Sequence, residues 1–217
     1  MRDTSLDVDD PNVSMTDITY HKSYIYSHCH ASTNLKHMLK VENDRLIFMQ
    51  GNFLTYALKQ LIKPTMKGFW VPVRIDHGAS LKFTHDELIG LQNCGEHVGG
   101  KISIASKKIK TFQLVPITFI NELDIESCEH LLDFDGMPNV LTSLTINYQQ
   151  LKHNLKHIFY ACSPRCTVKL PSESDKNLEH IVNYGILRKG GRLTDRQALL
   201  QLQTDLIDHD FDEYSDI

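Results

Sequence analysis

Residues 101–120 read KISIASKKIKTFQLVPITFI, and this stretch decides the predicted fold. Two apolar runs, at 102–104 and 112–120, lie on either side of a lysine-rich segment. Strand-forming residues that flank a short polar connection are typical of a β-hairpin. Pro116 further indicates an edge strand or a bulge, because proline cannot donate a hydrogen bond within a sheet. We therefore expect an antiparallel pair of strands here.

Outward from this stretch, strand and helix signals are intermixed along the chain. Segments with the character of strands lie at 69–75, 81–83, 141–148 and 167–170. Apolar residues at helical spacing favour helices at 85–93, 151–159 and 178–185, and from residue 194 onward. We find no repeat at a fixed period. The sequence predicts a single α+β domain, with a mainly antiparallel sheet, several short helices and flexible acidic termini.

Two of these segments give specific expectations about side chains. The acid-rich segment 122–134 is expected to be a helix with four residues inward, namely Ile125, Cys128, Leu131 and Leu132. Thr194 and Gln197 have the form of a capping box, which marks the start of a helix. The apolar residues expected to dock this second helix are Leu199, Leu200, Leu202, Leu206 and Ile207.

Charge is unevenly distributed along the chain and suggests its domain boundaries. Residues 1–17 carry a net charge of −4 and residues 205–217 carry −6, whereas the whole chain is −4, so the 18–204 body is +6. We interpret 1–17 as a disordered acidic tail, 18–204 as a single globular domain and 205–217 as an acidic C-terminal tail. A basic body with acidic ends is compatible with binding to polyanions, although acidic ends are more often only solvated.

Ten basic residues in three groups are the candidate polyanion-binding site. They lie on the predicted hairpin, on the 151–159 helix and around Gly190-Gly191, and comprise Lys101, Lys107, Lys108, Lys110, Lys152, Lys156, Arg188, Lys189, Arg192 and Arg196. Ammonium and guanidinium groups bind phosphates without reading sequence. The alternative is that these side chains only keep the surface soluble.

A possible structural zinc site is the main cofactor hypothesis. Cys94, His97, Cys162 and Cys166 would supply four ligands of the types found in tetrahedral zinc sites. The two pairs are more than sixty residues apart in the sequence. Cysteines of this kind are also common as small core residues, and that alternative predicts no metal.

These observations favour a non-enzymatic binding protein for RNA, another polyanion or an anionic membrane surface, modulated by its acidic tails. A self-assembling structural or protein-interaction protein, in the style of a virus-encoded matrix-like or accessory protein, is the alternative. An enzyme of unknown type ranks third, since no catalytic motif is found. The final residues Ser215, Asp216 and Ile217 have the hydroxyl-x-hydrophobic form of a peptide-binding-domain ligand.

The sequence also bears on location and assembly. No apolar stretch reaches the length of a membrane span, and the N-terminus is acidic where a secretion signal would be basic. The five cysteines are an odd number and are scattered, which favours a reducing compartment. We expect a cytoplasmic or nuclear protein, and the sequence leaves open whether it forms a homo-oligomer.

Overall fold

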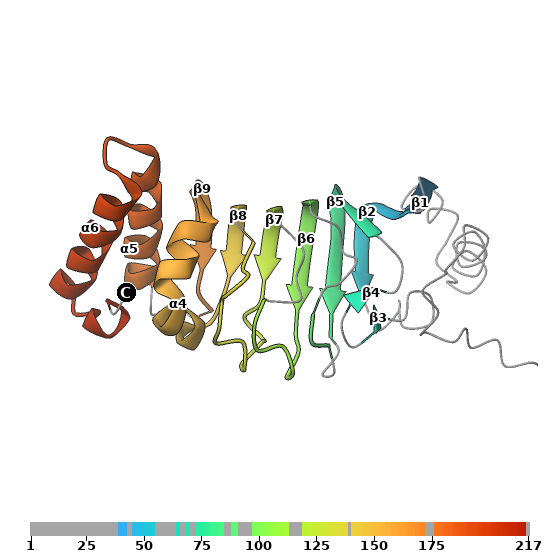
Figure 1. Ribbon diagram of the computed structural model, residues 1–217, viewed down its shortest axis with the longest axis horizontal. Coiled ribbons are helices and arrows are strands. Elements are labelled where there is room, and N and C mark those ends of the chain that lie inside the picture. Colours follow the sequence, from blue (N-terminus) through green and yellow to red (C-terminus); the bar gives the residue numbers. More distant parts are fainter. Residues whose placement is uncertain are drawn as a thin grey trace, which may run out of the picture.

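The computed structural model describes residues 39–42, 45–54, 64–65, 68–69, 73–84, 88–90, 97–112, 119–138, 140–171 and 176–215. Its centre is one sheet whose strands lie side by side in nearly sequential order, β1-β2-β5-β6-β7-β8-β9 (Figure 1). The strands are β1 (Leu39–Glu42), β2 (Arg45–Leu54), β5 (Val73–Phe83), β6 (His97–Ile104), β7 (Phe119–Asp124), β8 (Val140–Thr145) and β9 (Cys162–Lys169). A separate pair, β3 (Pro64–Thr65) and β4 (Gly68–Phe69), is antiparallel.

The prediction of a mainly antiparallel α+β sheet is wrong, because six neighbouring strands, β2 to β9, run parallel and only β1 runs antiparallel to them. The predicted hairpin within 101–120 is replaced by a parallel pair, with Ile102 of β6 opposite Leu123 of β7. Parallel strands require the chain to return to the starting end, so the lysine-rich segment opens a long crossover and not a tight turn. The molecule is an α/β fold.

The strands are related by a 21-residue repeat that the sequence analysis missed. Leu81, Ile102, Leu123 and Leu144 are consecutive partners across four strands, and each follows the previous one by 21 residues. All four side chains are fully buried. Each repeat therefore contributes one strand and one return segment, and stacking the repeats builds a continuous core.

The repeat around β7 has the spacing of a leucine-rich repeat. Ile120, Leu123, Ile125 and Cys128 are all fully buried and follow the pattern L-x-x-L-x-L-x-x-N/C. Cys128 donates its S–H to the Ile104 carbonyl of the preceding repeat over 3.3 Å. Burial raises the pKa of this thiol to about 11, so it remains protonated at neutral pH.

The helix predicted at 122–134 is wrong. Residues up to Asp124 belong to β7, and turns follow it. Ile125, Cys128 and Leu131 do point inward as expected, whereas Leu132 is 42% exposed. The inward residues of the strand and the turn happen to recur at near-helical spacing, which explains the incorrect prediction.

Two buried amide side chains of the helical segment 148–161 donate hydrogen bonds to the backbone of the return segment after β7. Gln150 is fully buried and donates to the carbonyls of Ile125 and Cys128 at 3.0 and 2.9 Å. Asn154, also buried, donates to the Leu132 carbonyl at 3.0 Å. Buried carbonyl groups without a partner are costly, so these amides hold the turns of one repeat against the helix that follows.

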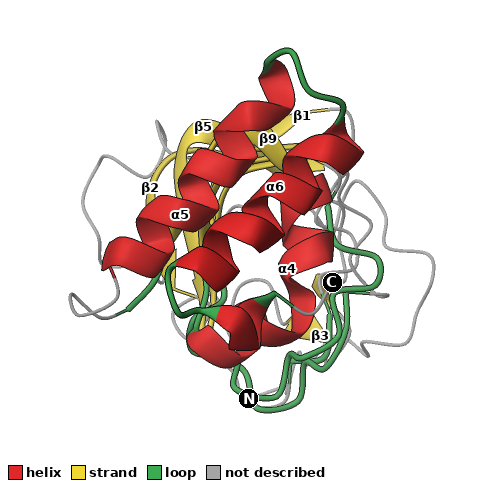
Figure 2. Ribbon diagram, turned by 90° about the vertical axis from the view of Figure 1, so that its left-hand side faces the viewer, coloured by secondary structure: helices red, strands yellow, loops and turns green. Residues whose placement is uncertain are grey.

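Three helices cover the C-terminal end of the sheet: α4 (Tyr148–Ala161), α5 (Lys176–Leu187) and α6 (Asp195–Asp208) (Figure 2). They confirm the helices predicted in this region. The Thr194–Gln197 capping box at the start of α6 is also present. In the part of the chain that the structure describes, no helix combines the length and apolar character needed to span a bilayer.

Side chains of α5 occupy the exposed edge of the sheet. The Asn183 amide accepts from the Val168 amide at 2.7 Å and donates to the Val168 carbonyl at 2.9 Å. Glu179 accepts from the Leu170 amide at 2.8 Å. These bonds satisfy backbone groups of β9 that would otherwise be free to pair with another strand.

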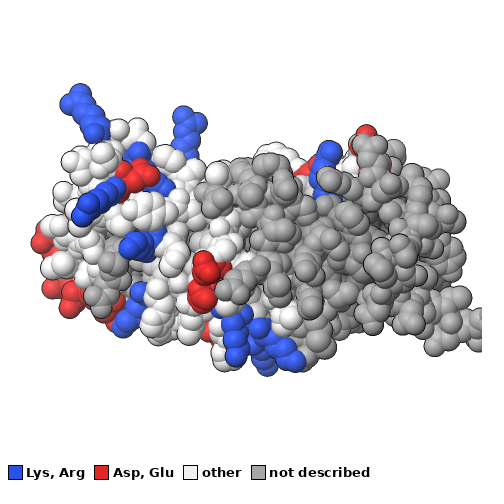
Figure 3. Space-filling model, viewed as in Figure 1, with Lys and Arg blue, Asp and Glu red and all other residues white. Residues whose placement is uncertain are grey.

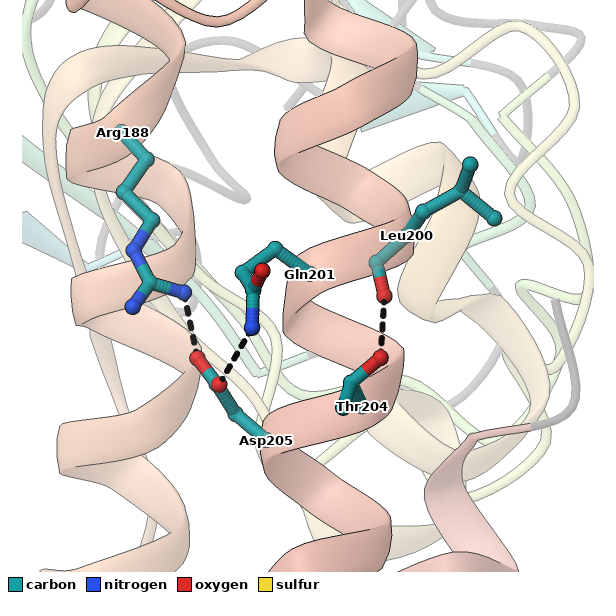
Figure 4. A network of polar contacts seen from close by, with 5 residues as sticks. All are labelled: Arg188, Leu200, Gln201, Thr204 and Asp205. Atoms are coloured by element: carbon teal, nitrogen blue, oxygen red, sulfur yellow. Dashed lines mark hydrogen bonds and ion pairs between the residues drawn. The ribbon is translucent and has the colours of Figure 1, made fainter.

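The acidic C-terminal segment is folded as far as residue 215, contrary to the expected flexible tail. Asp205 lies in α6, where it pairs with Arg188 and accepts from Gln201 at 3.1 Å (Figure 4). Beyond α6, a 3-10 turn (Asp212–Tyr214) places the Tyr214 side chain in the core, at 8% exposure. The predicted tail at 1–17 lies outside the described residues.

The docking face of α6 is narrower than predicted. Leu199, Leu202 and Leu206 are buried, as expected. Leu200 and Ile207 are each 54% exposed, because they lie on a side of the helix outside this buried stripe. The buried stripe thus follows helical periodicity more strictly than the clustering of leucines suggested.

Candidate binding surface

The outward face of the parallel sheet carries two straight rows of polar side chains. They lie on either side of the buried row formed by Leu81, Ile102, Leu123 and Leu144. The first row runs from β5 to β9 through Ser80, Lys101, Glu122, Ser143 and Thr167. The second row runs through Lys82, Ser103, Asp124, Thr145 and Lys169. All ten side chains are at least partly exposed. We call this surface the open face.

Two hydrogen-bonded pairs lie on the open face nearer the amino ends of the strands. The His77 ring nitrogen Nδ1 lies 2.7 Å from the Gly99 carbonyl oxygen. Since a carbonyl only accepts, Nδ1 carries the proton in this contact. On the next strands, Thr142 donates to the Asn121 side-chain oxygen at 2.6 Å. These bonds fix the orientation of polar groups across four strands.

Charges on the open face are mixed and partly neutralised. Lys101 of β6 lies 3.6 Å from Asp124 of β7, with side chains 38% and 30% exposed. On β5, Arg74 pairs with Asp76 at 2.7 Å, and this hydrogen bond raises the pKa of Arg74. Exposed pairs of this kind contribute little to stability. Their main effect is to leave the surface polar without a large excess of one sign.

The predicted polyanion site is not brought together as one surface. Several of its members make intramolecular contacts, among them Lys101 with Asp124, Lys152 with Glu213 at 2.7 Å, Arg188 with Asp205, and Lys189 with carbonyl groups. The Glu213 contact raises the pKa of Lys152, so this ammonium group stays charged throughout the neutral range. The acidic segment therefore does meet basic residues, but through fixed ion pairs.

Lys189 has a structural position. Its ammonium group donates to the carbonyls of Phe159, Tyr160 and Cys162 at 2.6, 3.2 and 2.7 Å. These groups lie at the C-terminal end of α4, where carbonyls lack partners within the helix. Burial lowers the pKa of Lys189. Lys189 therefore caps the C-terminal end of α4, and its ammonium group is a poor candidate for phosphate binding.

Lys107, Lys108 and Lys110 remain exposed on the segment that follows β6. Figure 3 shows Lys and Arg side chains gathered at the lower edge of the molecule and again over the helical end. The other exposed members of the predicted set lie on α4 or around the start of α6, namely Lys156, Arg192 and Arg196. The three lysines after β6 are thus the densest exposed basic group of the predicted set.

The zinc hypothesis meets a geometric obstacle. Cys162 and Cys166 are both buried in β9, but His97 begins β6, three strands away at the same level of the sheet. Three strand spacings amount to about 14 Å, too far for two side chains that must each approach one ion to about 2.3 Å. Cys94 lies outside the described residues. Among those described, no three histidine, cysteine or acidic side chains form a group able to hold a metal.

The predicted partner-binding tail is only partly described. The Ser215 carbonyl accepts from Gln203 at 2.9 Å, and the Ser215 hydroxyl donates to the Asp212 carbonyl at 2.6 Å. Ser215 is therefore tied to α6 and to the preceding turn. Asp216 and Ile217 lie outside the described residues.

Sequence reasoning missed the open face because its residues are chemically unremarkable one at a time. Serines and threonines such as Ser103, Ser143 and Thr145 form no motif in the sequence. The signal that could have found them is their position, directly before or after a buried residue that recurs every 21 residues.

Comparisons with protein-family models, with curated protein sequences and with solved structures gave no match.

Proposed function

We propose that this protein is a binding scaffold that recognises a protein partner through the open face of its sheet. The observation that carries the proposal is the pair of aligned polar rows across β5 to β9. Solenoids present extended surfaces of this kind, on which neighbouring repeats add to one continuous contact. The row positions are all accessible in the folded chain.

The chemistry of the face favours a protein over a nucleic acid or a lipid surface. Hydroxyl groups on β8 and carboxylates on β7 are flanked by Lys82 and Lys169 at the ends of the second row, whereas the first row ends in Ser80 and Thr167. Glu122 is exposed and has no ion pair among the described residues. A phosphate backbone would meet unfavourable carboxylates there, whereas protein interfaces combine both charge signs with about one hydrogen bond per 100–200 Å².

A photoreactive amino acid placed at Ser143 tests which surface the partner touches. We expect a specific covalent adduct from Ser143 in the native cellular background. The control is the same amino acid at Glu129, which is exposed on the return segment after β7. Adducts that form at Glu129 and not at Ser143 would place binding on the return segments and refute the proposal.

Polyanion binding is a second candidate function, supported by the exposure of Lys107, Lys108 and Lys110 on one segment. Changing all three to glutamine is expected to weaken RNA or anionic-liposome binding. The salt dependence should flatten by up to ~3 phosphate equivalents, because fewer counterions are released. Lys152→Gln is the matched control, since Lys152 already pairs with Glu213. If the triple variant and the wild type bind RNA and liposomes equally well, these lysines do not bind polyanions and contribute only to solubility.

A further inference from the structure

An irregularity in β9, a bulge that has three more residues than the matching part of β8, brings two cysteines together. Leu141 of β8 is opposite Cys162, and Ser143 is opposite Thr167. Five residue steps on β9 are therefore matched to two on β8, which span only about 6.6 Å. Cys166 precedes Thr167, so its backbone lies close to that of Cys162 although the two are four residues apart.

The two thiols point into the same buried site. Cys162 is 1% exposed and Cys166 is 5% exposed, while Pro164 and Arg165 between them face solvent. Both thiols are free. Disulfides require a Cα separation of about 4.4–6.8 Å, which is comparable to the span of about 6.6 Å for the two β8 steps that the bulge is matched to.

A positive charge lies beside the pair. The Lys189 ammonium interacts electrostatically with both sulfurs while it donates to the Cys162 carbonyl at 2.7 Å. The neighbouring Cys166 side chain, together with burial, raises the pKa of Cys162, so Cys162 keeps its proton at neutral pH. Cys166 is the more exposed of the two residues, at 5% against 1%, and is therefore the one assigned the first reaction with a small oxidant.

We propose that Cys162 and Cys166 form a reversible disulfide when the protein meets a peroxide. The Cys166 thiolate attacks one peroxide oxygen and breaks the O–O bond, which gives a sulfenic acid and, after protonation, water or an alcohol. The Cys162 sulfur then attacks the sulfenic sulfur, and its proton leaves with the hydroxyl as a second water. The two thiols lose two electrons in total, and the peroxide gains them.

The bond would fix the bulge against the helical end of the molecule. Pro164 lies so close to Gly190, in the turn between α5 and α6, that a Cβ on Gly190 would be 3.1 Å from the proline Cβ. Lys189, next to Gly190, already holds the Cys162 carbonyl. Oxidation is therefore expected to slow hydrogen exchange in residues 163–166.

Hydrogen peroxide on the full-length protein tests the proposal, followed by thiol blocking and trypsin digestion. Trypsin cleaves after Arg165, between the two cysteines, so the disulfide joins the separate peptides 157–165 and 166–169. We expect this joined pair, a loss of two of the five alkylatable thiols, and full recovery with dithiothreitol. Cys128→Ser should leave the result unchanged, because Cys128 bonds elsewhere, to Ile104.

Other outcomes would overturn the proposal. These are a disulfide that includes any other cysteine, oxidation of Cys166 only to sulfinic or sulfonic acid, or five thiols that remain alkylatable. The joined peptides are read from the wild-type protein, so the test does not depend on whether a Cys162→Ser variant folds. If the Cys162→Ser variant folds, we expect that peroxide treatment does not produce the disulfide-linked peptides 157–165 and 166–169.

Discussion

Replacing Leu131 with alanine is expected to lower the free energy of unfolding by about 3–4 kcal/mol, within the range for leucine truncations that leave a cavity. Leu131 is fully buried in the return segment after β7. Stacked repeats share one core, so the cavity affects the packing of both neighbours. Equilibrium denaturation in urea measures the change.

The adjacent leucine is the matched control. Leu132 is 42% exposed, and Leu132→Ala keeps the backbone carbonyl to which Asn154 donates. We expect a loss of about 0.5 kcal/mol, as for surface substitutions in general. Equal effects of the two substitutions would contradict the turn structure after β7 and would favour the helix first predicted for 122–134.

Gly100→Ala is expected to have a comparably large effect. A Cβ at Gly100 would lie 2.0 Å from the Ala79 carbonyl oxygen and 2.6 Å from that of Asp76. Both atoms belong to the β5 backbone, which cannot move without breaking the parallel pairing of β5 and β6. We expect a loss of about 3 kcal/mol, at the upper end for overpacking, and a lower melting temperature.

Gly99→Ala provides the comparison, because its nearest contact would be the His77 amide nitrogen at 3.1 Å. That clash requires only a small shift, and we expect a loss below about 1 kcal/mol. If Gly100→Ala melts like the wild type, the close approach of β5 and β6 at this bulge is incorrect.

The C-terminal third of the fold was predictable from sequence because its signals are local. The capping box at Thr194 and the apolar spacing of α4 and α5 depend on residues within one or two helical turns. Strand direction is a different kind of property. Two apolar runs around a polar segment are compatible with either a hairpin or a crossover, and only their partners along the sheet distinguish the two.

The repeat was hard to detect because few of its positions are apolar in every copy. The row of Leu81, Ile102, Leu123 and Leu144 keeps strict spacing, as does the row of Phe83, Ile104, Ile125 and Ile146, but a register shift between Val98 and Lys101 gives β6 one residue more than β7. The next step, to Val168 of β9, is 24 residues, because the bulge at Cys162 to Cys166 adds length. A search for similarity between whole repeats therefore finds little.

For the candidate site residues, the sequence could predict exposure to solvent from charge, but not which charged side chains make structural contacts. Lys107, Lys108 and Lys110 are exposed as expected for a solvated segment. Lys189 instead binds three carbonyls at the end of α4, and Arg188 pairs with Asp205. These contacts join segments distant in the sequence, so composition alone could not separate structural from available charges.

The most direct test of the binding-scaffold account is the affinity for the partner captured through Ser143, measured by calorimetry with Ser143→Arg/Thr145→Arg. Both side chains lie on the open face and are partly exposed, so the melting temperature should not change. We predict at least a tenfold increase in Kd, which corresponds to about 1.4 kcal/mol, and no change for the control Glu129→Arg. An unchanged Kd for the double variant, with weaker binding by Glu129→Arg, would contradict the account.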